Sequence, residues 1–250
     1  YRRKSTYDHH QRQGGMAGIT AFFIFHTKYS YNRKKVATFK FGRYGEQRFP
    51  QYVIYRIENE TLYNQALFNT TLSFPEILGV TFLHITSMDL CRDYKFNVMT
   101  RIRKTAKDNK VSVLVNGKVI DKRADIDCGK LTHTLNFYKT KNPTLNLCQK
   151  KARKDKSKGL TLCAYNKNNE IATSSNKEYI REFYGNPKTL HRLEIHQNCQ
   201  EIKDYLKGAV QDITLLSDQG FLDGMFLAHL SSLLRFNKGR KHLDWQEILQ

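Results

Sequence analysis

Alternating apolar and polar residues predict short β-strands along much of the chain. Period-two alternation of this kind is typical of strands with one buried face. An Asn-Gly pair at positions 116 and 117 lies between two such runs and predicts a tight hairpin. The predicted strands cover residues 19–26, 36–41, 52–58, 80–93, 111–115, 118–120, 131–138, 160–165 and 192–196.

Apolar residues at helical spacing predict fewer helices, of which residues 221–236 form the clearest, with Leu222, Met225, Phe226, Leu230 and Leu233 on one stripe. Further helices are predicted at 62–68, 99–107, 177–184 and 201–207, with a short one around Trp245. Together these elements predict an α+β fold, a central antiparallel sheet flanked by helices, with a small helical C-terminal part. The expected divisions are a basic N-terminal arm at 1–15, a main domain at 16–207 and a helical C-terminal extension at 208–250.

Three of the predicted strands carry reactive side chains among their apolar positions. In LTLCAYNKNNEI, residues 160–171, Tyr165 has the opposite parity to Leu162 and Ala164 and stands where asparagines end the strand. A tyrosine at a strand end is accessible to a substrate, so Tyr165 is a candidate nucleophile. The alternative is that Tyr165, one of 14 tyrosines, only packs against its neighbours.

Acidic residues mark the other two strands. In ITSMDLCRD, residues 85–93, Asp89 and Asp93 fall on one face, where a bound cation or arginines would relieve their repulsion. Pairing of one of them with Arg92, or a turn cap, is the alternative. In RLEIH, residues 192–196, an Arg, a Glu and a His share one face. Glu and His are good ligands for a divalent metal, although an exposed edge with internal salt bridges would give the same pattern.

Composition adds a strong positive charge. Forty-two Lys and Arg against 23 Asp and Glu give a formal net charge of +19, which favours a polyanionic partner. Nucleic acid is the leading candidate for this partner. The charge alone does not choose between structural RNA, DNA and an anionic membrane surface. Residues 139–158 are dense in cations just before Tyr165, and they could hold a nucleic-acid backbone or be a solvated loop. The candidate DNA-binding residues are Lys150, Lys151, Arg153, Lys154 and Arg192.

Cysteine usage and hydropathy bear on the compartment. Five cysteines, an odd number without a CxxC pair, indicate reduced thiols rather than disulfides or a zinc ribbon. The longest apolar run, residues 19–25, is too short to span a bilayer. The chain starts at Tyr1 rather than Met, so a natural N-terminus with a targeting segment could be missing.

Taken in order, ITSMDLCRD, LTHTLNFY, LTLCAYNKNNEI, a helix and HRLEIH followed by a helix resemble the replication initiation factors of rolling-circle plasmids and the related replication proteins of filamentous phages. The resemblance covers residues 82–206, and the YNK turn and the RLEI strand are its most specific parts. It implies a metal-dependent enzyme that nicks and joins single DNA strands through a phosphotyrosine intermediate, a nucleotidyltransferase that starts rolling-circle replication.

The resemblance also implies roles for individual residues. Tyr165 matches the nucleophilic tyrosine, and Lys167 matches the lysine beside it. The matching metal ligands, for Mg²⁺ or Mn²⁺, are Asp89 and Glu194, with Asp93 and His196 as further candidates. No His-hydrophobe-His pair is present, which departs from better-known nicking enzymes and favours a carboxylate-dominated metal site.

The implied substrate is a single-stranded or hairpin origin of a plasmid or phage in the cytoplasm of a bacterial host. A host helicase and polymerase are the implied partners, and no membrane is involved. Whether the protein forms a homodimer is left open. Two other readings fit the same features. One is a conjugative relaxase with the same chemistry, and the other is a non-catalytic basic nucleic-acid-binding protein in which Tyr165 packs.

Overall fold

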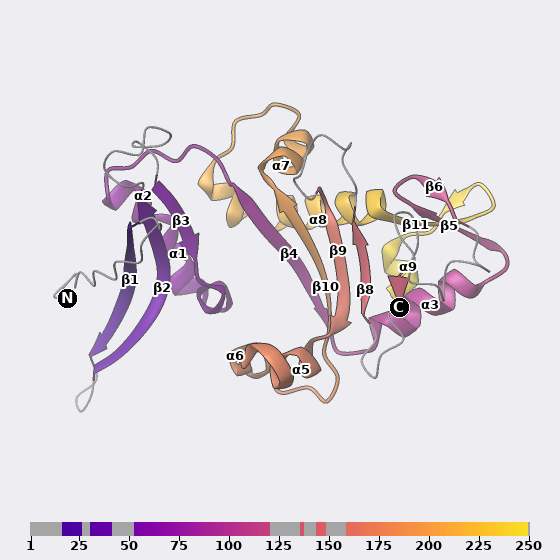
Figure 1. Cartoon of the computed structure of the whole chain (residues 1–250), viewed down its shortest axis with the longest axis horizontal. Helices are drawn as coiled ribbons and strands as arrows, with labels where there is room; N and C mark the ends of the chain where they lie inside the picture. The colour runs from indigo at the N-terminus through magenta and orange to yellow at the C-terminus, as the bar shows by residue number, and fades with distance from the viewer. Residues whose placement is uncertain are drawn as a thin grey trace. The chain divides into compact units, whose positions relative to one another are not determined.

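The computed structural model describes residues 17–26, 31–41, 53–120, 136–137, 144–148 and 159–249 (Figure 1). The fold is α+β with antiparallel sheets, as predicted. It divides into two compact units, Tyr1–Thr81 and Phe82–Gln250. The expected arm at 1–15 lies outside the described residues. The boundary at 81/82 differs from the expected division at 207/208, because the core of the second unit includes residues on both sides of position 207.

The first unit is a three-stranded sheet with short helices. β1 (Ala17–His26), β2 (Tyr31–Phe41) and β3 (Val53–Ile57) pair in that order. Its core includes Val36 and Phe39, and the Phe39 ring stacks on Tyr55 with centroids 4.5 Å apart. β2 begins at Tyr31, five residues before the strand predicted at 36–41. The short helices are η1 (Asn59–Tyr63), α1 (Gln65–Leu72) and α2 (Phe74–Ile77).

The second unit contains the central five-stranded antiparallel sheet, in the order β4-β10-β9-β8-β7 (Figure 1). The predicted strand at 80–93 is shorter at its start, because residues 80–86 lie outside any strand. Of the predicted strand 131–138, only 136 and 137 fall within the described residues. The bounds are β4 (Ser87–Tyr94), β7 (Asn136–Phe137), β8 (Leu145–Cys148), β9 (Thr161–Asn166) and β10 (His191–Asn198).

A second sheet runs in the order β12-β11-β5-β6. Asn116 and Gly117 connect β5 (Val111–Val115) to β6 (Lys118–Val119), and their φ values of 50° and 75° confirm the predicted hairpin. β11 (Leu234–Lys238) pairs with β5 and with β12 (Lys241–His242).

Helices cover one face of the central sheet. α3 (Val98–Lys107) packs against β9 and β10, and α8 (Gln219–Leu233) crosses β4, β10 and β9 (Figure 1). The sheet residues on this face are apolar and buried, and they share one core with the buried sides of both helices. They include Leu90, Leu162, Ala164, Leu193 and Ile195.

The remaining helices follow the strands in sequence. They are α5 (Lys167–Glu170), η2 (Ile171–Ser175), α6 (Glu178–Phe183), α7 (Cys199–Leu206), η3 (Ile213–Leu216) and α9 (Trp245–Leu249). Among the described residues, no helix has the length and apolar character needed to cross a membrane.

The C-terminal part corrects the predicted helix at 221–236. α8 ends at Leu233, and residues 234–238 continue as β11. Leu234 and Phe236 are fully buried while Arg235 between them is exposed, which is the alternation of a strand. The C-terminal part is therefore helical at α8 and α9 but also adds two strands to the second sheet.

Candidate active site

Strand pairing brings the three reactive stretches onto one face of the central sheet. β10 lies between β4 and β9, so Arg192, Glu194 and His196 each have a residue opposite them on both sides. Arg192 stands opposite Asp93 and Tyr165, and His196 stands opposite Asp89 and Thr161. Glu194 lies midway, and it is therefore a diagonal neighbour of Asp89, with Cβ atoms about 7–8 Å apart in such pairs. Strand register thus places Asp89, Glu194 and Tyr165 on one face of the sheet.

The Tyr165 hydroxyl donates a hydrogen bond to Glu194 Oε2 at 2.9 Å. Burial, and after it the charge of Glu194, raises the pKa of the phenol well above its ordinary value. The hydroxyl therefore keeps its proton at neutral pH and presents it to a carboxylate on the next strand. Glu194 is thus the carboxylate placed to accept the phenolic proton, because its Oε2 already contacts the hydroxyl.

The turn after Tyr165 positions Lys167. The Asn166 side chain accepts a hydrogen bond from Asn169 N at 3.0 Å, so the strand passes directly into α5. The asparagines thus end the strand as predicted, but by capping a helix. Lys167 follows with only 3 % of its side chain exposed, and its Nζ lies 2.6 Å from Glu170 Oε2 and 5.6 Å from the Tyr165 ring centroid. Burial, followed by the charge of Arg192, lowers the pKa of Lys167.

Arg192 and Asp93 form a buried, two-point ion pair. Arg192 Nε donates to Asp93 Oδ1 at 2.7 Å, and Nη2 donates to Oδ2 at 2.6 Å. The side chains are 8 % and 1 % exposed. Since both carboxylate oxygens are used and the guanidinium is buried, this geometry supports neither the predicted metal-ligand role of Asp93 nor the predicted DNA contact of Arg192. Arg192 Nη1 also lies 3.9 Å from Glu194 Oε2, so the pair holds Glu194 in place.

This ion pair should be critical for stability. Asp93→Ala is expected to lower the free energy of unfolding by about 3–5 kcal/mol, because the Arg192 guanidinium would stay buried without its carboxylate. Urea denaturation followed by circular dichroism measures the loss. The matched control is Asp223→Ala, which removes a second Arg-Asp pair to β4, Arg92–Asp223, whose side chains are 30 % and 44 % exposed. That change should cost about 0–1 kcal/mol. Equal losses in the two variants would contradict the assigned role of Asp93.

Asp89 and His196 form a second pair at the open end of the same face. His196 Nδ1 lies 2.6 Å from Asp89 Oδ1, and the side chains are 48 % and 58 % exposed. In the part of the chain that the structure describes, no three His, Cys, Asp or Glu side chains converge as a complete metal-binding group. Two protein ligands nevertheless suit Mg²⁺ or Mn²⁺, which commonly complete their shell with water and substrate phosphates. Asp89 and His196 are the exposed pair that could supply two ligands to such a cation, whereas both carboxylate oxygens of Asp93 are already bound by Arg192.

Most of the predicted basic loop at 139–158 lies outside the described residues, and residues 145–148 form strand β8 instead of loop. Lys150, Lys151, Arg153 and Lys154 all fall in the segment 149–158, so their DNA-binding roles stay predictions.

The structure also shows a second basic surface, on α3, whose residues were not among the predicted DNA-binding residues. α3 buries Val98, Met99, Ile102 and Ala106 against the core. Its exposed side carries Arg101, Lys104 and Lys107. Cations three residues apart lie on one side of a helix, so this spacing was the signal that could have revealed the surface. We call these three residues the α3 basic face.

The α3 basic face is expected to contact DNA phosphates. Replacing Arg101, Lys104 and Lys107 together by Ala should reduce the slope of log affinity against log salt for single-stranded DNA by about 2, or about 0.7 per lost contact. A filter-binding titration at several salt concentrations measures this slope. The control removes three exposed lysines elsewhere, Lys188, Lys203 and Lys238, and hence the same total charge. A slope that falls equally in both triple variants would show that net charge, and not the α3 basic face, governs binding.

No protein-family model matches the chain, and no curated protein or solved structure matches it either. The function is therefore inferred from the geometry described above.

Proposed function

We propose that this protein nicks and rejoins single-stranded DNA through a phosphotyrosine link on Tyr165, and that it thereby starts rolling-circle replication of a plasmid or phage. The observation that carries the proposal is the 2.9 Å hydrogen bond from the Tyr165 hydroxyl to Glu194. A half-buried tyrosine at a strand end, with a carboxylate in contact and two buried cations around it, combines a nucleophile with a base.

The proposed reaction is a transfer of one phosphodiester bond. Glu194 takes the phenolic proton while the Tyr165 oxygen attacks the phosphorus in line. The bond from phosphorus to the 3′ oxygen breaks, and that oxygen takes a proton from water to become a 3′ hydroxyl. The 5′ phosphate stays bound to Tyr165, which conserves the phosphodiester energy. A DNA 3′ hydroxyl can later displace the tyrosine, returning its proton and rejoining the strand.

The two buried cations stabilise the charge that develops on the tyrosine. Lys167 Nζ lies over the Tyr165 ring, 5.6 Å from its centroid, and Arg192 Nη1 lies 3.9 Å from Glu194 Oε2. Both side chains are held by carboxylates, so their positions are set before the substrate arrives. In this proposal Lys167 acts as a positioning residue. Its buried ammonium, paired with Glu170, places a positive charge near the Tyr165 ring.

A divalent cation, Mg²⁺ or Mn²⁺, would be held by Asp89 and His196 at the exposed end of the site. When bound there it would polarise the scissile phosphate as a Lewis acid. The protein's own residues orient the tyrosine, accept its proton and fix Glu194.

The net charge of +19 supports a nucleic-acid substrate. We propose single-stranded DNA, either melted or looped from a hairpin origin, because the nucleophile must reach an unpaired backbone. In a bacterial cytoplasm such an initiator would work with a host helicase and polymerase, as a monomer or a homodimer.

Incubation with circular single-stranded DNA and Mn²⁺ tests the proposal. The expected result is a covalent protein–DNA adduct that survives denaturation, together with a free 3′ hydroxyl that a polymerase can extend. The chain incubated with the same DNA and EDTA is the control for the cation. If neither Mg²⁺ nor Mn²⁺ yields an adduct or a nick on any single-stranded substrate, the non-catalytic binding protein becomes the better description.

A further inference from the structure

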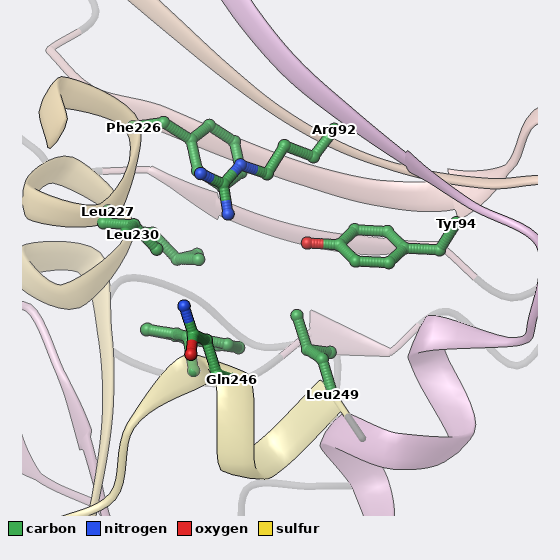
Figure 2. Close-up of a pocket in the computed structure, with 8 residues that line it drawn as sticks. Arg92, Tyr94, Phe226, Leu227, Leu230, Gln246 and Leu249 are labelled. Carbon is green, nitrogen blue, oxygen red and sulfur yellow. The ribbon is translucent and has the colours of Figure 1, made fainter. Parts of the chain in front are cut away.

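A cavity of about 290 Å³ lies on the helix-covered side of the central sheet, between β4, α8 and α9 (Figure 2). It is distinct from the tyrosine site, although the two share a strand. Arg92 and Tyr94 line the cavity, and Asp93 between them belongs to the opposite face. Ligand binding in the cavity would therefore leave the face with Tyr165 open.

Three polar groups from different elements surround this cavity. Figure 2 shows the Arg92 guanidinium, the Tyr94 hydroxyl and the Gln246 side-chain amide directed toward the same space. Together they provide donors and acceptors in one small volume. The indole N–H of Trp245, a further lining residue, is buried and has no acceptor among the described residues.

The electrostatics of the cavity favour a neutral ligand. Arg92 Nη2 lies 2.7 Å from Asp223 Oδ1, so the cation at the rim is already balanced by a carboxylate. A phosphate or carboxylate entering the cavity would compete with Asp223 for the guanidinium. A neutral polar group can accept from the remaining N–H groups of Arg92 without that competition.

The walls favour a flat ring. Phe226, Leu230 and Trp245 supply apolar and aromatic surface, and the Arg92 guanidinium lies 5.0 Å from the Phe226 ring centroid. A volume near 290 Å³ is large enough for a single nucleobase. Flat heterocycles that carry both donors and acceptors are bound in this way by proteins that take a base out of its stack.

We propose that this cavity binds one unpaired nucleobase of the single-stranded DNA substrate, with the phosphates of that nucleotide left outside. The proposal rests on the proposed function for its substrate and adds a second contact to it. A base held beside Arg92 would fix the strand relative to β4, the strand that also carries Asp89 and Asp93. The cavity thereby contributes to the choice of the nicked position.

Trp245 gives a direct test, since it is the single tryptophan of the chain and lines the cavity. Its fluorescence is followed while a thymidine oligonucleotide is added to the Tyr165→Phe variant, which binds without reacting. An abasic oligonucleotide of equal length has the same phosphates and no bases. We expect saturable quenching with the first and little or none with the second. Equal quenching by both would overturn the proposal, because the signal would then report only backbone binding.

Two variants assign the signal to the cavity. Tyr94→Phe and Gln246→Ala each remove one polar group and should weaken base-dependent quenching by about 2- to 10-fold, the effect of one hydrogen bond. Their affinity for the abasic strand should stay the same. Matched controls are Tyr179→Phe on α6 and Gln200→Ala on α7, neither of which lines the cavity. If the cavity variants bind like the controls, the proposal is wrong.

Adding free deoxythymidine tests whether the cavity binds a base within a DNA strand or a free nucleoside. Weak quenching by deoxythymidine supports the assignment to DNA, and quenching as tight as with the oligonucleotide would overturn it. The binding test is independent of the chemistry. An adduct without base-dependent quenching would remove the cavity proposal alone, whereas quenching without any adduct from the parent chain would remove the nicking proposal and support the cavity.

Discussion

Tyr165→Phe is expected to abolish both the covalent DNA adduct and the nick while leaving affinity for single-stranded DNA unchanged. The substitution removes one oxygen and keeps the ring, and no other atom at that position can attack phosphorus. Loss of the hydrogen bond to Glu194, a charged acceptor, should lower the free energy of unfolding by about 1.5–3 kcal/mol. A labelled oligonucleotide on a denaturing gel measures adduct and nick together.

Tyr179→Phe is the matched control for this experiment, because Tyr179 lies on α6, just beyond the site helices α5 and η2. It should form the adduct at the parent rate. An adduct that persists in Tyr165→Phe would mean that another tyrosine is the nucleophile. Mapping the DNA-linked peptide by mass spectrometry would then identify it.

Glu194→Gln is expected to slow nicking by about 10²- to 10⁴-fold, the usual contribution of a positioned general base. An amide keeps the size of the side chain and can still accept a hydrogen bond from Tyr165, but it does not take up the phenolic proton. Single-turnover cleavage of an oligonucleotide, with binding measured in parallel, separates the rate from the affinity.

Glu170→Gln is the control for the loss of a nearby negative charge. Glu170 contacts Lys167 and not the Tyr165 hydroxyl, so this variant should lose far less activity. A cleavage rate in Glu194→Gln equal to that of the parent would show that a different group removes the proton. The contact between Tyr165 and Glu194 would then be only structural.

The sequence predicted which side chains share a face, because alternation along one strand is a local property. Arg192, Glu194 and His196 were expected on one side of a strand and lie there. The partners of these residues depend on register between distant strands, which no local pattern specifies. Asp89 and Asp93 are equivalent in sequence terms, yet pairing with β10 places one beside an exposed histidine and the other beside a buried arginine.

Boundaries were mispredicted where two patterns overlap. The apolar residues of α8 continue into Leu234 and Phe236 without a break, so helical spacing alone extended the helix into β11. The helix ends at Leu233 because residues 234–238 pair with β5, a contact more than a hundred positions away. The cavity was equally hidden, since Arg92, Phe226 and Gln246 come from three separate elements.

The location of β4 at the rim of the central sheet has a dynamic consequence. Among the described strands it pairs only with β10, so half of its backbone groups lack a neighbouring strand. Such a strand detaches at a lower free energy than one inside the sheet. Local unfolding of β4 would separate Asp93 from Arg192 and Asp89 from His196, but Tyr165 and Glu194 would remain together on β9 and β10. Hydrogen exchange should therefore be faster in β4, which carries Asp89 and Asp93, than in β9 and β10, which carry Tyr165 and Glu194.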